Sequence, residues 1–327
     1  MHATATNASA AIEVTREVIA SGTTPAHIDL RCPRCKAAVP EFNCKECGFQ
    51  LRNIKGVIHA LPPERVVYFA RFVEEYERIR SAEGRGSESD EFYLGLPYSD
   101  ASRRNTAQWA IRARSFDFLL ERVLKPALSR GGAILDLGAG NCWMSYRLAL
   151  AEYRPCAVDL LTNERDGLGA AEHYRNYLPC FFPRFRAEFA HLPFGDGQFD
   201  AVVFNASFHY AENFESAVNE ALRCCKPGGM VIVSNTPWYS NDVSGKKMVD
   251  ERQASFLRNY GTSSASIESL EYLTDERLKY LECRLKIRWN AYTPNLGVKW
   301  ALRPLLAKLR NRREPSRFCI YVTRKAS

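Results

Sequence analysis

Two glycines beside an acid form the stretch of the sequence best suited to hold a ligand. Residues 134–143 read ILDLGAGNCW, so that Gly138 and Gly140 follow an apolar run that carries Asp136. Glycines lack Cβ atoms and therefore let the backbone approach a ligand closely. A lone Gly-x-Gly does not distinguish a nicotinamide dinucleotide from another adenosine ligand, but Trp143 stands where a dinucleotide fingerprint has its third glycine. The loop thus favours an adenosine ligand other than NAD.

Asp136 indicates the chemistry at the other end of that ligand. A carboxylate at this position would repel a pyrophosphate, whereas it would attract an ammonium group. An adenosine that carries a cationic amino-acid tail is S-adenosylmethionine, and we expect it as the cofactor. The alternative is that Asp136 only caps the loop.

The segment from about residue 130 to 236 resembles the class I S-adenosylmethionine-dependent methyltransferases, near the ubiquinone and menaquinone biosynthesis type. Five matched segments occur in order: the ILDLGAG loop, CAVDL, Leu-Pro-Phe at 192–194, GQFDAVVFNASFHY, and Pro-Gly-Gly at 227–229. The resemblance implies that the chain is an enzyme of this type and that two acids bind the adenosine. Asp159, at the end of the second strand, would hold the ribose hydroxyls, and Glu188, four positions before Leu192, would contact the adenine amino group.

A carboxylate suits the ribose independently of kinship, because it accepts both hydrogens of a diol. The alternatives are an Asp159 that pairs with a neighbouring arginine and a Glu188 that is a solvated strand end. The complete cofactor-binding set that we expect is Asp136, Gly138, Gly140, Asp159, Leu160, Glu188, Phe189 and Asn205.

Transfer of a methyl group from a sulfonium is an in-line displacement, which needs an aligned nucleophile but no metal and no covalent intermediate. In this family the exit of the fourth strand faces that point, and here it reads Asn205-Ala-Ser-Phe-His209-Tyr210. We expect Asn205, His209 and Tyr210 to be catalytic, with His209 as the general base if the acceptor is a hydroxyl or a thiol. The alternative is that His209 is structural.

Four cysteines near the N-terminus have the spacing of a metal site. Residues 32–47 read CPRCKAAVPEFNCKEC, two Cys-x-x-Cys pairs formed by Cys32 and Cys35 and by Cys44 and Cys47. Each pair lets one tight turn aim two thiolates at one point, and two turns complete a tetrahedral site. We expect structural zinc, although a rubredoxin-like iron site would use the same geometry, and a redox Cys-x-x-Cys would stand alone.

Alternating strand and helix patterns surround these residues and predict a fold. They favour an α/β, Rossmann-like, seven-stranded and mostly parallel sheet flanked by helices. The expected strands are 133–138, 155–160, 184–189, 200–206, 229–235, 285–292 and 318–324. The expected helices are 141–151, 164–177, 213–225 and 247–260, with a further helix capped by Thr274.

Composition shifts divide the chain into four parts. We expect a flexible tail at 1–27, a zinc ribbon at 28–62, a helical linker and lid at 63–104, and a class I methyltransferase domain at 105–327. Aromatic residues that could form a lid over the acceptor are Tyr93, Tyr98, Trp109 and the stretch Thr236-Pro-Trp-Tyr239, although aromatics at such places are also ordinary core residues.

The bulk composition limits the partners. No apolar run is long enough to span a membrane and no secretory leader is evident, so we expect a cytoplasmic protein, and cysteines clustered for metal fit a reducing compartment. The net charge of +8 is concentrated in residues 299–327, which hold nine Lys and Arg against one acid. Within 299–313 the cations alternate with leucines, as on an amphipathic helix whose charged side meets water.

Three functions remain open at this point. We expect a small-molecule acceptor, such as a quinone-like compound, a lipid or a secondary metabolite. The alternative is ribosomal or transfer RNA, bound by the zinc ribbon and the basic C-terminal segment; that segment could also touch anionic lipid. A cofactor-binding scaffold without turnover is the third function. The sequence does not settle the oligomeric state.

Overall fold

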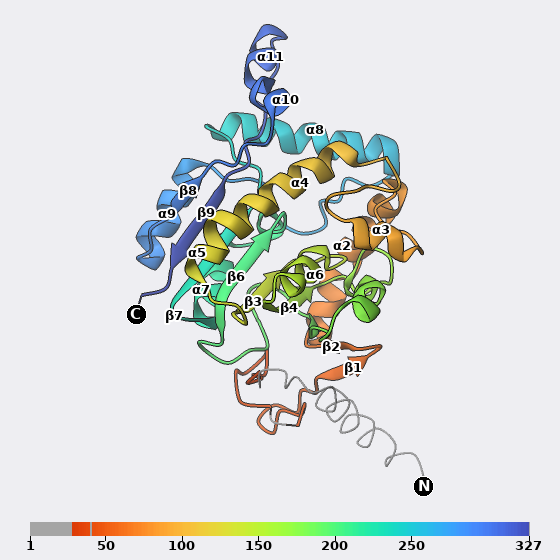
Figure 1. The fold of residues 1–327 in the computed structure, drawn as a ribbon, viewed down its shortest axis with the longest axis vertical. Helices are drawn as coiled ribbons and strands as arrows, with labels where there is room; N and C mark the ends of the chain where they lie inside the picture. The colour runs from red at the N-terminus through yellow and green to blue at the C-terminus, as the bar shows by residue number, and fades with distance from the viewer. Residues whose placement is uncertain (1–27, 40, 327) are drawn as a thin grey trace.

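A single nine-stranded sheet organises the protein. The computed structural model describes residues 28–39 and 41–326, so the predicted tail at 1–27 lies outside the described residues. The strand order is β1-β2-β5-β4-β3-β6-β7-β9-β8 (Figure 1). Their bounds are β1 (Arg52–Ile54), β2 (Val57–His59), β3 (Ala133–Leu137), β4 (Arg154–Asp159), β5 (Arg184–Arg186), β6 (Phe199–Asn205), β7 (Cys225–Ser234), β8 (Asn290–Tyr292) and β9 (Ile320–Arg324).

The seven strands from β3 to β9 correspond to the seven predicted segments. Parallel pairing joins β5, β4, β3, β6 and β7, and β9 runs antiparallel between β7 and β8. The prediction of a mostly parallel sheet flanked by helices is therefore confirmed. The count of seven was wrong, because the segment predicted as a zinc ribbon at 28–62, which we call the N-terminal module, adds β1 and β2 to the edge beyond β5.

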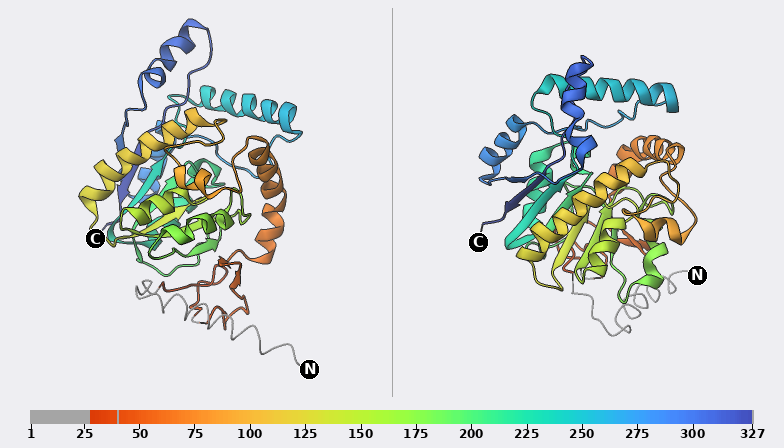
Figure 2. Two further views of the ribbon diagram at one scale, coloured as in Figure 1. Left: turned by 45° about the vertical axis from the view of Figure 1, so that its right-hand side comes forward. Right: turned by 45° about the horizontal axis from the view of Figure 1, so that its top comes forward.

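Helices cover both faces of the sheet (Figures 1 and 2). The elements are α2 (Pro63–Ala82), α3 (Asp90–Gly95), α4 (Thr106–Phe118), the π-helical turn η1 (Leu119–Leu124), α5 (Lys125–Ala127), α6 (Trp143–Leu150), the 3₁₀ segments η2 (Leu168–Tyr177) and η3 (Phe208–Tyr210), α7 (Phe214–Cys224), α8 (Asp242–Tyr260), α9 (Asp275–Leu285), α10 (Val298–Ala301) and α11 (Arg303–Leu309).

Alternation along the buried strands divides the core into two layers. Ile134 and Val203 pack with α4 and α6 on one face, whereas Leu135 and Val202 pack with α7 and α9 on the other. Central parallel strands are buried on both faces, which explains why the sequence of β3 reads as a continuous apolar run interrupted only by Asp136.

Most predicted helices are present, with shifted ends. The segment predicted at 164–177 is a 3₁₀ helix, and α8 begins at Asp242, five residues before the predicted start, because the Asn241 side chain accepts a hydrogen bond from the Ser244 N–H. Thr274 caps α9 as predicted, since its side chain accepts from the Arg277 N–H. No helix in the part of the chain that the structure describes is long and apolar enough to cross a bilayer.

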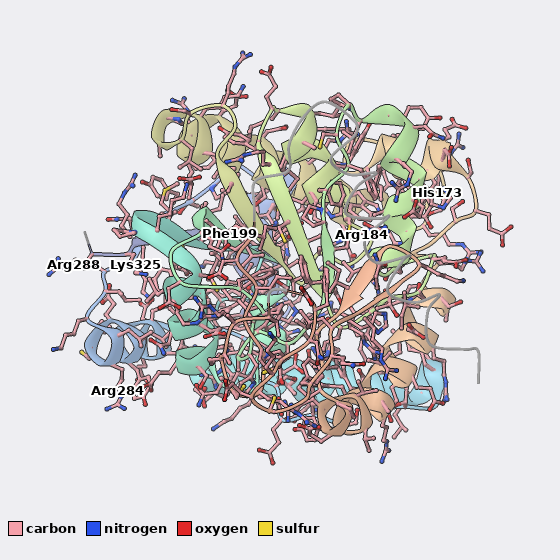
Figure 3. The ribbon with its side chains drawn as sticks, turned by 90° about the horizontal axis from the view of Figure 1, so that it is seen from below. His173, Arg184, Phe199, Arg284, Arg288 and Lys325 are labelled. Atoms are coloured by element: carbon pink, nitrogen blue, oxygen red, sulfur yellow. The ribbon has the colours of Figure 1, made fainter. Side chains whose placement is uncertain are left out.

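The N-terminal module continues the main sheet and does not hang free. Its β2 pairs in parallel with β5, and the N–H of Ala60 donates to the carbonyl of Arg186 at 2.9 Å. Arg184, labelled in Figure 3, lies near the turn of the β1–β2 hairpin, so close that a Cβ on Gly56 would be 2.6 Å from its guanidinium. Lys36 also forms an ion pair with Glu220 of α7 at 2.7 Å.

The four cysteine sulfurs of this module meet at one point. Sγ of Cys32 is 3.5 Å from Sγ of Cys47, and Sγ of Cys35 is 3.4 Å from Sγ of Cys44, with all four within 4.8 Å of one another. A Zn–S bond of about 2.3 Å places the sulfurs of a tetrahedral site about 3.8 Å apart. The cluster could therefore hold a zinc ion, as the sequence predicted.

The local backbone explains why the cysteines converge. Each Cys-x-x-Cys pair closes a turn in which the N–H of the residue four positions after the first cysteine donates to its carbonyl, from Lys36 to Cys32 and from Gly48 to Cys44. Both closing residues are left-handed, with φ of 62° and 71°. The two turns thus have the same form, and each aims its sulfurs at the other.

We predict that metal loss destabilises the whole chain, because Val39 and Phe49 of the module belong to the same core cluster as β3 and β6. Cys44→Ser should remove zinc and lower the free energy of unfolding by more than about 4 kcal/mol, the range seen when a structural metal is lost. Elemental analysis and denaturant unfolding measure both effects. Cys283→Ser, at an exposed cysteine outside the cluster, is the control. An unchanged unfolding midpoint in Cys44→Ser would contradict a structural role.

Candidate cofactor and acceptor site

A cavity of about 430 Å³ lies at the carboxyl ends of β3, β4 and β6. Helices α2 and α4 supply its other wall, although both precede the sheet in the chain. Ligands of parallel sheets bind at this edge, and the volume is in the range of small-molecule sites. All eight predicted cofactor-binding residues line it: Asp136, Gly138, Gly140, Asp159, Leu160, Glu188, Phe189 and Asn205.

The glycine loop forms the floor of the cavity. The N–H groups of Gly138 and Ala139 both donate to the carbonyl of Val158, at 2.8 and 3.0 Å, which ties the loop to β4. Gly138 has a φ of 75°, and a Cβ there would be 2.2 Å from the Cβ of Ser207. Glycine is therefore needed at 138 both for the backbone angle and for the space.

Trp143 lines the cavity and packs against α4. Its ring meets those of Trp109 and Phe116 edge-on, with centroids 6.0 and 5.6 Å apart. The close helix packing that a third glycine allows in dinucleotide-binding loops is replaced here by an aromatic contact between α6 and α4. Since Trp109 also lines the cavity, this contact positions the α4 side of the site.

Four buried carboxylates line the cavity, those of Asp136, Asp159, Asp166 and Glu188, and the first two belong to β3 and β4. Asp136 accepts a hydrogen bond from the Ser145 hydroxyl at 2.7 Å, and burial raises the pKa of its carboxyl to about 7. Asp159 accepts from the N–H groups of Gly140 and Leu161, each at 2.8 Å, and burial raises its pKa to about 6. Within the described residues Asp159 forms no ion pair with an arginine. Among the described residues, both acids are thus held by neutral donors and have no cation as an ion-pair partner.

Glu188 already has a cation, supplied by α2. The guanidinium of Arg65 donates to both of its oxygens, with the shortest contact at 2.6 Å, and also reaches Glu212 at 3.0 Å. His191 Nδ1 lies 3.2 Å from the same carboxylate. Glu188 is therefore no solvated strand end. It joins the cofactor side of the cavity to α2 across 123 residues of sequence.

Aromatic side chains of α2 form the wall opposite the sheet. Phe69, Phe72 and Tyr76 line the cavity, and the ring of Tyr76 meets that of Tyr210 edge-on at 5.5 Å. Arg80, one turn further along α2, pairs with Asp166. The predicted lid region at 63–104 contains this helix. Of the individual aromatics that the sequence suggested for a lid, however, only Trp109 lines the cavity.

The three predicted catalytic residues separate in the structure. Asn205 and Tyr210 line the cavity, whereas His209 is absent from its lining and is buried behind it, with its ring centroid 4.3 Å from that of Tyr210. Burial lowers the pKa of His209 to about 4, so its imidazole is neutral. His191, which sequence reasoning passed over, is the histidine that lines the cavity.

Arg112 of α4 also lines the cavity, and only its helical spacing from Trp109 could have indicated this from the sequence. Its guanidinium lies 4.8 Å from the centre of the Trp109 ring. Burial, with Arg80 and Arg85 nearby, lowers its pKa to about 10. Between residues 28 and 326, Pro40 aside, no carboxylate forms an ion pair with it. The cavity therefore presents one uncompensated cation to an anionic group of a ligand.

Comparison with known proteins identifies the domain that carries this cavity. Residues 135–233 match the family model of the methyltransferase domain. The chain carries a methyltransferase domain. The predicted kinship with S-adenosylmethionine-dependent methyltransferases is thereby confirmed, and the residues that line the cavity fit that cofactor, because two buried acids and one arginine that form no ion pair with any described residue lie beside the glycine loop.

The relatives of the methyltransferase domain are methyltransferases of different substrates. An arsenite methyltransferase of Aquipseudomonas alcaligenes is 27% identical over 39% of this chain and 38% of its own length. A demethylmenaquinone methyltransferase of Mycobacterium tuberculosis is 26% identical over 44% of this chain and 58% of its own. Among solved structures, the YcgJ protein of Bacillus subtilis has a TM-score of 0.48 at 13% identity, covering 66% of this chain and 99% of that one. The chain thus spans 38% of the length of the arsenite methyltransferase and 58% of that of the demethylmenaquinone methyltransferase.

We predict that the methyltransferase domain does not tolerate a side chain at Gly138. Gly131→Ala, at a φ of 79° with open space around the Cβ, should cost about 1–2 kcal/mol of unfolding free energy from backbone strain alone. Gly138→Ala shares that strain and in addition displaces Ser207, so it should cost clearly more and abolish binding of S-adenosylmethionine. Denaturant unfolding and calorimetry test this. Equal costs at the two positions would contradict the packing argument.

Proposed function

We propose that this protein transfers the methyl group of S-adenosylmethionine to a small, largely apolar and planar acceptor. The observation that carries the proposal is that the carboxylates of Asp136 and Asp159, the glycine loop and an aromatic wall line one cavity. When bound, the cofactor supplies a methyl carbon already activated by a sulfonium. The protein's own residues then have to orient the two partners and exclude water, which can provide much of the rate.

Each end of the cofactor has a partner in the cavity. Asp136 suits an ammonium group, and the uncompensated Arg112 suits a carboxylate, so together they match the zwitterionic amino-acid end. Asp159 retains free lone pairs for the ribose diol, since each oxygen accepts only one backbone N–H. Glu188 faces the adenine amino group while Arg65 holds it in place.

The aromatic wall supports an apolar acceptor. Phe72, Tyr76 and Tyr210 present ring faces and edges, which favour a flat conjugated molecule over a sugar or a peptide. A quinone-like compound or an aromatic secondary metabolite has this character, whereas a lipid acceptor shares only the apolar part of it. In this proposal Asn205 and Tyr210 position the acceptor, and His209 acts from behind Tyr210 by fixing its ring.

The binding test uses Asp159→Ala and titration calorimetry with S-adenosylhomocysteine. We expect a loss of affinity of more than about a hundredfold, because two hydrogen bonds to a charged acceptor contribute about 1.5–3 kcal/mol each. Glu164→Ala, which removes an exposed acid beside the same strand end, is the control and should bind normally. Equal affinity of wild type and Asp159→Ala would remove the ribose assignment.

A second arm of that test separates the two ends of the cofactor. Arg112→Gln should lose about tenfold in affinity for S-adenosylhomocysteine but none for 5′-methylthioadenosine, which lacks the amino-acid end. If both ligands weaken equally, Arg112 supports the fold of the cavity; if neither weakens, Arg112 faces the acceptor.

The raised pKa of Asp136 predicts how pH acts on binding and stability. Between its ordinary value and about 7 the native carboxyl holds a proton that the unfolded chain has lost, so the unfolding free energy of the free protein should fall as pH rises through this window. Affinity for S-adenosylmethionine should rise over the same window, by up to about tenfold per pH unit, because only the ionised carboxyl attracts the ammonium. Between about pH 6 and 7, above the pKa of Asp159, Asp136→Asn should flatten both profiles, and a rise in affinity that survives this substitution there would contradict the assignment.

A further inference from the structure

Helices α10 and α11 project from the body of the molecule, at the top of Figure 1 and in both views of Figure 2. The sequence predicted an amphipathic helix whose charged side alone meets water. In the structure the apolar side is exposed as well, and neither helix has a buried residue. Five exposed side chains, which we call the leucine stripe, follow the spacing of one helical face: Val298, Leu302, Leu305, Leu306 and Leu309.

Contacts at both ends of the helical pair fix the position of the leucine stripe, and we call the residues that make them the base. The ring of Trp300 stacks on that of Phe318, just before β9, at 5.0 Å between centroids, and the guanidinium of Arg303 lies 3.8 Å from the Trp300 ring centre. Arg313, after α11, pairs with Glu251 of α8 at 2.6 Å. These contacts tie both ends of the helical pair to the domain while Val298 and Leu309 remain 76% and 74% exposed.

The polar residues around the stripe carry one sign of charge. From 298 to 313 the chain contains six Lys and Arg and no acid. Arg303 and Arg313 serve the base, whereas the other four are exposed and form no ion pair with any described residue: Lys299, Lys308, Arg310 and Arg312. An apolar stripe beside unpaired cations is thus presented at the tip of the molecule.

One kind of surface can bind both the apolar stripe and the unpaired cations. RNA would neutralise the cations, but it would gain little from five exposed apolar side chains. A second copy of the chain would cover the stripes, but it would bring the same cations together without counter-charge. An anionic bilayer takes apolar side chains below its headgroups and attracts Lys and Arg to its phosphates, which is how interfacial helices bind.

We propose that α10 and α11 dock this protein on an anionic phospholipid bilayer, with the leucine stripe inserted among the acyl chains and the four free cations against the headgroups. This docking uses no residue of the cavity. It therefore stands or falls independently of the proposed methyl transfer.

The experiment is sedimentation of the full chain with vesicles of phosphatidylcholine alone or mixed in equal parts with phosphatidylglycerol. We expect binding to the mixed vesicles only, weakening as salt is raised. Leu305→Ser combined with Leu309→Ser should reduce binding by about tenfold or more. Both leucines are exposed in the free protein, and the variant loses the free energy gained when they are buried in the bilayer. Lys308→Gln combined with Arg310→Gln should reduce it by about fivefold for each cation.

Matched controls are Val67→Ser, at an equally exposed apolar residue of α2, and Lys279→Gln, at an exposed unpaired lysine of α9. Both should bind vesicles as wild type does, and all variants should keep the wild-type circular dichroism spectrum and unfolding midpoint, which shows that they are folded. Binding to vesicles that ignores the leucine change would overturn the proposal. The proposal would also be overturned if the protein did not bind vesicles but bound RNA through these cations. Self-association that the leucine substitutions abolish would overturn it as well.

Discussion

Two acidic side chains buried at the end of a parallel sheet, without a cation of their own, are the constraint on which the site depends. Asp136 and Asp159 are kept in place by a hydroxyl and by backbone N–H groups, which hold the carboxylates but do not neutralise them as a cation would. Burial of unneutralised charge is unfavourable unless a partner arrives. In the free protein the raised pKa values of both carboxyls let protons take the place of that partner, and a cationic ligand displaces the proton of Asp136, so affinity depends on pH and on the charge of the ligand through the same feature.

The opposite wall repeats this logic with the signs reversed. Arg65 and Arg80 reach from α2 to Glu188 and Asp166, and these pairs hold the helix over the sheet. Arg112, beside Trp109, has no such partner in the part of the chain that the structure describes. Arg65 and Arg80, which stabilise the fold, and Arg112, which is free to bind a ligand, thus lie on neighbouring helices. Only the ion pairs that they form in the structure distinguish them.

The sheet and the cofactor side of the cavity could be predicted from the sequence because their signals are local. An apolar run that ends in Asp136 and two glycines, or in Asp159, places those residues at the carboxyl end of a strand with no knowledge of the rest. The wall formed by α2 could not be predicted in the same way. Its position depends on contacts such as that of Arg65 with Glu188, far apart in the chain, and on the pairing of β2 with β5. The burial of His209 behind Tyr210 and the exposure of the leucine stripe likewise depend on packing that periodicity does not reveal.

The short connection between β2 and α2 has a consequence for how such an enzyme changes its preferences. Only three residues separate His59 from Pro63, so the position of the N-terminal module determines where α2, and with it the aromatic wall of the cavity, begins. A substitution within the module that tilts β2 against β5 would reshape the acceptor's side of the cavity, although no residue in contact with a substrate had changed. Divergence toward new substrates is in this way open to mutations far outside the reaction centre.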